Sequence, residues 1–294
     1  MYLRTFNLKT TYMIAYTGTG LLGSNFVKAL LKKGEQVNVW NRTHAKAKVL
    51  EKDGAKAFES ITEAVKNAER LHLTLKDDAA VDEILEKARP GFKTGLIIVD
   101  HTTTSTEGAA KRTAYWKQQG FTYLHAPVFM GPSNALDSTG YMLVSGDQEL
   151  IKKLEPALSA MTGKLINFGT EPNRAAAVKL LGNSFLLFLT TGWSDVLALA
   201  KAMQVPSSDL TSLFAEWNPG ASAPARLKKI LAADFDHPTW ELNMARKDAG
   251  LMIREAENAG QHLTAIPAIA AEMDRWIKKG HGQSDWTVIA KDNL

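Results

Sequence analysis

The sequence predicts an α/β protein in which a doubly wound, mostly parallel sheet precedes an all-helical domain. Up to about residue 170, short apolar runs of strand length alternate with helical patterns, which is typical of parallel strands joined by helical crossovers. Beyond Gly169 the strand pattern stops and helical patterns continue. We therefore expect a sheet domain over residues 1–170 and a helical domain over residues 171–294, joined by a long interdomain helix.

Capping residues mark where the elements of the sheet domain begin and end. Gly34 and Gly54 are stop signals after helices, Asp77 and Asp147 are N-cap residues, and a capping box begins at Ser60. The last strand is expected to close the sheet, and the late strands are the candidates for antiparallel pairing. The expected strands are residues 12–16, 36–40, 71–75, 96–100, 121–126, 141–145 and 165–168, and the expected helices are 21–33, 43–53, a short one after residue 60, 77–88, 107–119 and 147–161.

The helical domain is expected to begin with one long helix over residues 172–203. Its middle, residues 185–189, is apolar on every side, so its own domain or a second subunit must cover it. Pro206 ends this pattern, and further helices are expected to about residue 279.

The composition excludes several classes of protein. With 45% hydrophobic and 22% charged residues, the 294-residue chain is typical of a soluble globular protein. The absence of cysteine excludes disulfides and thiolate chemistry and is compatible with a cytoplasmic location. The seven histidines lack metal-ligand spacing, so we expect no metal and place them at the surface or in polar parts of the core. A net charge of +4 without a basic stripe argues against nucleic acid, and we expect neither a signal peptide nor a membrane span.

Three glycines follow the first expected strand at a spacing that binds dinucleotides. Gly18 allows the tight turn, Gly20 lets a pyrophosphate approach the backbone, and Gly23 lets the helix pack on the strand. The N–H groups at the start of the helix then hold the anion. The cofactor-binding residues expected here are Gly18, Thr19, Gly20, Leu21, Leu22 and Gly23.

The end of the second strand favours NADP(H). An NAD site usually carries a carboxylate there, whereas an NADP site carries Arg and small donors. The strand ends in Asn41-Arg42-Thr43, and no carboxylate occurs between Glu35 and Glu51. The guanidinium, hydroxyl and amide suit a 2′-phosphate, although Thr43 can also cap the next helix.

An amine and an amide lie one turn apart near the start of the long helix, at Lys179 and Asn183. A buried lysine can exchange a proton with a carbonyl or hydroxyl oxygen as hydride moves, and the amide can orient it. By itself such a pair is more often an ordinary surface feature.

Five short motifs occur in the order and spacing of a known family. They are Gly18-Thr-Gly-Leu-Leu-Gly23, Asp100-His-Thr-Thr103, His125-Ala-Pro-Val128, Lys179-Leu-Leu-Gly-Asn183 and Lys247-Asp248. With them, the chain from Met13 resembles the β-hydroxyacid dehydrogenases, the superfamily of 3-hydroxyisobutyrate dehydrogenase, glyoxylate and succinic semialdehyde reductases and 6-phosphogluconate dehydrogenase. The resemblance implies a Rossmann domain, a long helix and a helical domain that forms a homodimer, with a tetramer as the other possible assembly. Residues 1–12 have no counterpart.

The resemblance also implies roles for individual residues. Lys179 resembles the catalytic lysine and Asn183 its partner, and both are expected to touch substrate. Thr102 and Thr103 stand where the family has a Ser-Thr pair that contacts substrate or nicotinamide. Lys247 resembles a lysine that reaches back to cofactor or substrate. We also expect Leu75 against the cofactor and Trp240 near the substrate, although plain core packing is the more common role for a tryptophan at such a position.

The chain departs from the family in its substrate loop. Where the family usually has Ser-Gly-Gly, this chain has Phe129-Met130-Gly131, and only Gly131 keeps an open backbone N–H. The milder departure is Thr102 in place of Ser. We therefore expect a more apolar pocket, less suited to a small carboxylate.

The leading hypothesis is an NADP(H)-dependent oxidoreductase for a β-hydroxyacid-type alcohol or the corresponding aldehyde or keto acid. An imine reductase is the first alternative, on a similar architecture in which Asp or Tyr usually stands at the Lys179 position. A non-enzymatic NADP-binding interaction module is the second, and Lys179 and Asn183 argue against it.

Overall fold

The computed structural model describes residues 13–294, so the predicted N-terminal extension lies outside the described residues. The chain divides into two compact units between Asn183 and Ser184, and each unit is described by itself. The predicted division at residues 170 and 171 lies shortly before this point and remains a prediction. The first turns of the long helix belong to the first unit by their contacts.

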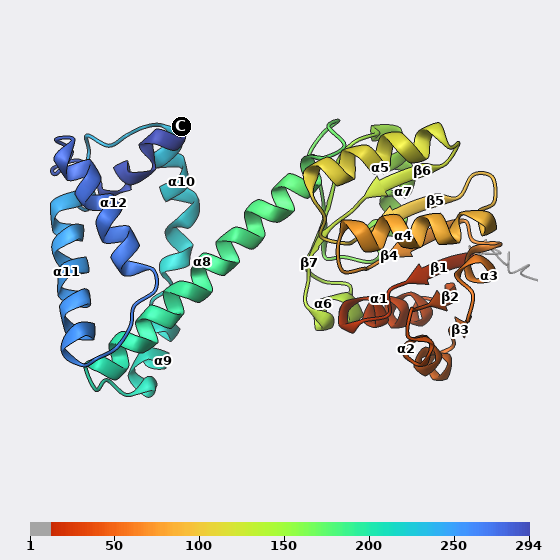
Figure 1. The fold of residues 1–294 in the computed structure, drawn as a ribbon, viewed down its shortest axis with the longest axis horizontal. Coiled ribbons are helices and arrows are strands. Elements are labelled where there is room, and N and C mark those ends of the chain that lie inside the picture. Colours follow the sequence, from red (N-terminus) through yellow and green to blue (C-terminus); the bar gives the residue numbers. More distant parts are fainter. Residues whose placement is uncertain (1–12) are drawn as a thin grey trace, which may run out of the picture. The chain divides into compact units, whose positions relative to one another are not determined.

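The first unit is built on a six-stranded parallel sheet (Figure 1), which confirms the predicted fold class. The strand order β3-β2-β1-β4-β5-β6 reverses direction at β1, as in doubly wound sheets that bind a ligand at the carboxyl ends of their strands. The strands are β1 (Met13–Thr17), β2 (Gln36–Trp40), β3 (Lys56–Ala57), β4 (Arg70–Leu73), β5 (Ile97–Asp100) and β6 (Thr122–His125).

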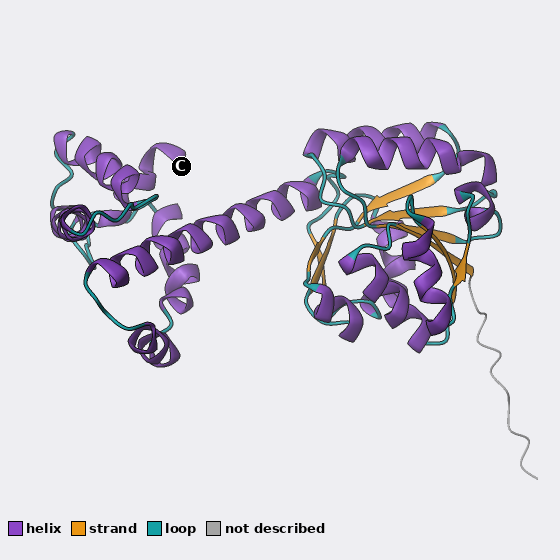
Figure 2. Cartoon of the chain, turned by 60° about the horizontal axis from the view of Figure 1, so that its bottom comes forward, coloured by secondary structure: helices purple, strands orange, loops and turns teal. Residues whose placement is uncertain are grey.

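Helices cover both faces of this sheet, as Figure 2 shows. One apolar core joins the sheet to α1 (Leu21–Lys32), α6 (Pro132–Asp137) and α7 (Gln148–Ser159). The other joins it to α3 (Ile61–Val65), α4 (Asp78–Ala88) and α5 (Thr106–Gln118). Asp77 and Asp147 accept backbone N–H groups as predicted N-caps. Helix α2 (His44–Lys48) continues as a 3₁₀ helix (Val49–Asp53) to Gly54, and a 3₁₀ turn (Arg89–Gly91) follows α4.

Two predictions about the late part of the first unit are wrong. The strand β9 (Lys164–Asn167) does not close the main sheet but pairs with β8 (Tyr141–Val144) in a separate three-stranded sheet. The segment between the predicted strands 121–126 and 141–145, expected to be one long loop, contains α6 and β7 (Val128–Phe129), and β7 pairs with β8 antiparallel. A strand of two residues is too short to show an alternating pattern, and β3 was not predicted for the same reason. Ser60 precedes α3 without the predicted side-chain cap.

The second unit is helical in its described residues and carries its own apolar core around Leu242, Met273 and Trp276. The helix α8 crosses the division between the units. The helices are α8 (Arg174–Ala202), α9 (Ser207–Glu216), α10 (Ala223–Leu231), α11 (Leu242–Asn258) and α12 (Ile266–Lys278), with 3₁₀ helices at Pro219–Ser222 and Trp286–Asn293.

A buried carboxylate fixes the end of α8 within the second unit. Asp195 is 2% exposed and accepts the backbone N–H groups of Thr264, Ala265 and Ile266 at 2.7, 2.8 and 2.9 Å. These are the amides at the start of α12, which otherwise lack partners in a helix. Burial disfavours the charged carboxylate, but these hydrogen bonds hold the pKa of Asp195 below its ordinary value.

The apolar middle of α8 is exposed. Phe185, Leu187 and Phe188 are 59–72% exposed. By length and composition alone α8 is apolar enough to cross a membrane, but one such helix is weak support for a span, since helices covered by protein pass the same test.

Candidate functional site

The turn from β1 into α1 has the geometry of a phosphate-binding turn. A β-carbon on Gly18 would lie 2.1 Å from the Thr74 carbonyl oxygen, and one on Gly23 would lie 2.0 Å from the Gly18 carbonyl oxygen. Both positions therefore require glycine. Gly20 has no atom within 4 Å of its β-carbon position and is exposed. Helix α1 begins there without a side-chain cap or an acidic residue in its first turn. Its free N–H groups thus fit the pyrophosphate of a dinucleotide.

The neighbouring loop is tied to this turn through Asn41. Its side-chain oxygen accepts the Thr19 backbone N–H at 3.1 Å, and its amide nitrogen donates to the Thr43 carbonyl oxygen at 3.0 Å. Thr43 is the N-cap residue of α2, but its hydroxyl does not accept a backbone N–H of that helix, so the capping role considered for it is not seen. Arg42 and Thr43 are exposed beside the glycine turn.

A hollow of about 390 Å³ joins the glycine turn to this loop. Gly18, Gly20, Arg42 and Thr43 line it, and so does Lys46, a cation that follows Arg42 in the sequence. The predicted site did not include five further lining residues: Trp40, Lys76, Asp77, Ala80 and Glu83. Leu75 also lines it, and its contact with the cofactor remains a prediction. The cationic side of the hollow fits a 2′-phosphate, since phosphate recognition relies on Arg and Lys donors.

Thr102 supports the loop after β4 through hydrogen bonds. It is 1% exposed, and its hydroxyl accepts the Leu75 backbone N–H at 2.9 Å. Its own N–H donates to Asp100 Oδ1 at 2.9 Å, and its carbonyl oxygen lies 2.8 Å from His125 Nε2. Thr103, by contrast, is exposed. Of the two predicted hydroxyls, Thr103 is the accessible one, and Thr102 holds Leu75 in place.

Three histidines lie in the core beside these loops. The sequence predicts the histidines either at the surface or in polar parts of the core, and these three follow the second expectation. His72, His101 and His125 are at most 2% exposed, and His72 Nδ1 lies 3.0 Å from His101 Nε2. Burial lowers the pKa of all three, that of His101 to about 4, so they are neutral near pH 7. They act here as hydrogen-bonding core residues. No cluster of three potential metal-binding side chains occurs among the residues the structure describes.

Lys179 and Asn183 come together as the sequence predicts. Lys179 Nζ donates to Asn183 Oδ1 at 2.9 Å, and Lys179 is 8% exposed. Burial lowers the pKa of the Lys179 ammonium, since the charged form loses hydration. A half-buried amide thus orients a buried amine, the arrangement needed for proton exchange.

The loop 129–131 lies against this pair. The Phe129 ring centroid is 4.2 Å from Lys179 Nζ. Met130 packs on the core shared by α1 and α7. The Gly131 N–H, expected to be open, already donates to Asn134 Oδ1 at 2.9 Å, because Asn134 sits in the first turn of α6 and reaches back to the N-cap.

The two remaining predicted residues belong to the second unit. Lys247 is exposed and pairs with Asp248 at 2.9 Å, and Trp240 packs edge-on against Trp286 with ring centroids 5.7 Å apart. Their contact with cofactor or substrate remains a prediction.

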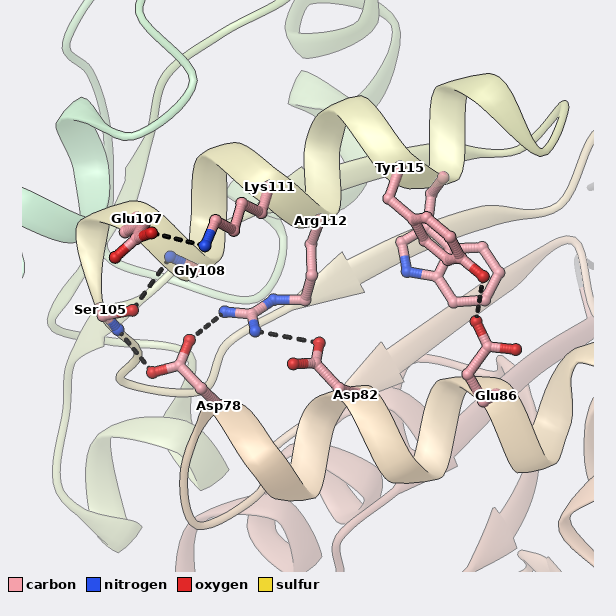
Figure 3. A pocket seen from close by; sticks show the side chains of 10 residues that line it. Asp78, Asp82, Glu86, Ser105, Glu107, Gly108, Lys111, Arg112 and Tyr115 are labelled. Carbon is pink, nitrogen blue, oxygen red and sulfur yellow. Dashed lines mark hydrogen bonds and ion pairs between the residues drawn. The ribbon is translucent and has the colours of Figure 1, made fainter.

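A second hollow of about 520 Å³ lies between α4 and α5 (Figure 3). Its buried Arg112 is fully engaged: it donates to Tyr123, Asp82 and Asp78 at 3.0, 3.1 and 2.6 Å. Asp78 in turn accepts the Ser105 N–H at 2.9 Å. Arg112, in the middle of α5, therefore joins this helix to the first two turns of α4, and its nitrogens already have acceptors within the protein. The sequence carried no signal for it, since one arginine in a helix looks like any surface cation.

Comparison with known proteins agrees with this geometry. Residues 13–169 match the model of the NAD binding domain of 6-phosphogluconate dehydrogenase. The chain is 26% identical to 3-sulfolactaldehyde reductase of Escherichia coli, over 94% of each chain. It is 27% identical to an NADPH-dependent reductive aminase of Aspergillus oryzae, over 94% of this chain and 95% of that one.

A solved structure has the same fold along almost the whole chain. The imine reductase from Myxococcus stipitatus in complex with NADP⁺ superposes with a TM-score of 0.90 over 96% of this chain and 100% of that one, at 21% identity. The glycine turn, the strand order and the match over residues 13–169 together show that this chain belongs to the family of NAD(P)-dependent oxidoreductases that carry the NAD-binding domain of 6-phosphogluconate dehydrogenase.

Proposed function

We propose that the protein is an NADP(H)-dependent reductase of an aldehyde or keto acid, and equally a dehydrogenase of the corresponding β-hydroxyacid-type alcohol. The observation that carries this proposal is the buried Lys179 with its ammonium on the Asn183 amide, 2.9 Å away. Relatives that reduce an aldehyde support the reaction class.

The bound nicotinamide supplies or accepts the hydride. The glycine turn would hold its pyrophosphate, and Arg42, Thr43 and Lys46 would hold a 2′-phosphate. Lys179 donates a proton to the carbonyl oxygen during reduction and accepts it from the hydroxyl during oxidation. The lowered pKa brings the amine closer to the working pH, where a general acid–base group is most effective.

The substrate is proposed to be bulkier or less charged than glyoxylate. Phe129 has no side-chain donor, and the Gly131 N–H is engaged by Asn134. The loop therefore offers few donors to a carboxylate close to the reacting carbon. Thr103, exposed in the loop after β5, is the accessible hydroxyl of the predicted substrate residues.

Reduction of a C=N bond is the second candidate. The NADPH-dependent reductive aminase, at 27% identity, and the apolar Phe129 favour it. Lys179 favours the carbonyl reaction, because that reaction requires a lysine that exchanges a proton with oxygen, whereas imine reductases usually carry Asp or Tyr at this position.

We further propose that a second copy of the chain covers the exposed apolar side chains of the second unit. An apolar area of this kind is what obligate homodimers bury, usually over more than about 2,000 Å². The side chains are Phe185, Leu186, Leu187, Phe188, Leu189, Trp193, Leu197, Leu213 and Trp217.

The experiment is NADPH oxidation against glyoxylate, larger semialdehydes and cyclic imines, with the unmodified protein and Lys179→Met. We expect turnover of a semialdehyde to fall by about 10²–10⁴ in the variant, while NADPH binding by fluorescence is kept. Lys201→Met, an exposed lysine of the same helix, is the matched control. Near-normal turnover by Lys179→Met would refute the proton role, and exclusive turnover of imines would favour the second candidate.

A further inference from the structure

The ring of Phe129 lies in a notch on the first turns of α8. A β-carbon on Gly182 would lie 2.2 Å from Cζ of Phe129 and 2.7 Å from Cε1, distances that real atoms do not reach. The ammonium of Lys179, one helical turn earlier, is 4.2 Å from the ring centroid. Phe129 therefore contacts α8 at two positions one turn apart, although 50 residues or more separate them in the chain.

The backbone of Phe129 cannot easily withdraw from this contact. Phe129 pairs with Tyr141 in the antiparallel ladder of β7 and β8. Next to Tyr141, a β-carbon on Gly140 would lie 2.8 Å from the Phe129 carbonyl oxygen, so glycine at this position lets the two chain segments come close. The ring is thus fixed by the second sheet while it packs on α8.

The ammonium of Lys179 has two neighbours of different kinds. Asn183 Oδ1 accepts one N–H at 2.9 Å. The aromatic face of Phe129 attracts the cation through its quadrupole and excludes water from the same side. Both neighbours restrict a flexible side chain that is free to rotate about four bonds when it is exposed.

We propose that Phe129 is a positioning residue for Lys179: its ring, seated on Gly182, holds the Lys179 ammonium between the aromatic face and the Asn183 amide. The role of Lys179 in proton transfer belongs to the proposed function on which this inference rests. The tests below measure Lys179 itself rather than turnover, so each of the two proposals can fail alone.

The first test follows the Lys179 pKa by NMR in protein whose lysines carry ¹³C at Cε, with the signal assigned by its loss in Lys179→Met. Phe129→Leu keeps an apolar side chain but removes the aromatic face. We expect the pKa of Lys179 to fall further, by about 0.5–1 unit, because the ammonium loses an attraction without gaining water. Phe121→Leu, the same change in the ring cluster with Phe92 and Trp116, is the control and should leave the signal unchanged. An unchanged pKa in Phe129→Leu would overturn the proposal.

The second test measures the coupling between the ring and the notch. Gly182→Ala should lower the melting temperature and move the Lys179 pKa, because the new methyl group displaces the ring. In a Phe129→Ala background the same methyl group has room, so Gly182→Ala should there leave the Lys179 pKa unchanged and change the melting temperature only as much as Gly192→Ala does.

Gly192→Ala serves as the control, since that position of α8 has no atom within 4 Å of its β-carbon site. If Gly182→Ala fails to fold alone but folds together with Phe129→Ala, the rescue supports the proposal. Equal effects of Gly182→Ala in both backgrounds would overturn it.

Discussion

Replacement of Arg42 tests the cofactor preference most directly. Arg42→Ala removes the guanidinium at the edge of the hollow beside the glycine turn and leaves the fold intact, since the side chain is exposed. NADPH differs from NADH only in the 2′-phosphate, so the variant should lose affinity for NADPH and keep its affinity for NADH.

The magnitude follows from the surroundings of Arg42. A hydrogen bond between charged groups contributes about 1.5–3 kcal/mol, or roughly ten- to hundredfold in affinity. Lys46 and Lys76 also line the hollow and remain in the variant, whereas Asp77 and Glu83 oppose a phosphate there. We therefore expect the lower half of this range, about ten- to thirtyfold.

The assay compares kcat/KM for NADPH and NADH, at fixed ionic strength, in the unmodified protein and in Arg42→Ala. Lys48→Ala is the control, an exposed cation of α2 that does not line the hollow. Equal use of both cofactors by the unmodified protein would refute the reasoning. So would a variant that loses NADH as much as NADPH.

Three further predictions concern stability and assembly. The pKa values of His72 and His101 lie below their ordinary value in the folded state, that of His101 at about 4, so the stability that depends on their neutral forms is present above about pH 6.5 and is lost as the pH falls below it. Urea unfolding should show a loss approaching about 1.4 kcal/mol per pH unit for each group, and equal stability at pH 7 and pH 4.5 would contradict this. Asp195→Ala leaves three backbone N–H groups at the start of α12 without their acceptor, so the second unit should lose about 2–4 kcal/mol of unfolding free energy; hydrogen exchange at Thr264–Ile266 measures it, and unchanged protection would count against the cap. Size-exclusion chromatography with light scattering should give at least twice the 32.2 kDa chain mass, and an active species at 32.2 kDa would refute the proposed dimer.

The parts of the candidate site differ greatly in how far apart their residues lie in the sequence. The glycine turn and the Lys179–Asn183 pair each lie within a few residues of sequence, and both have the predicted geometry. Thr102 joins the loops after β4 and β5 to the end of β6 through Leu75 and His125, and Arg112 joins two helices. The residues in these contacts lie far apart in the sequence.

The sequence by itself determined the features whose signals are short-range. Alternation of strand and helix patterns predicted the doubly wound sheet, and the capping residues Asp77 and Asp147 located the starts of α4 and α7. A spacing of four residues on a helix placed Lys179 beside Asn183, because i and i+4 side chains share one face. Each of these depends on backbone geometry that repeats in every helix or strand.

Only the tertiary structure decided which distant residues meet. It divided the strands into two sheets, buried three histidines in the core and set the Phe129 ring on Gly182. None of these pairs has a fixed sequence separation, and strands of two residues carry no period. The physical reason is that packing selects partners by shape and by the hydrogen bonds they complete, and those depend on the whole fold rather than on the neighbouring residues.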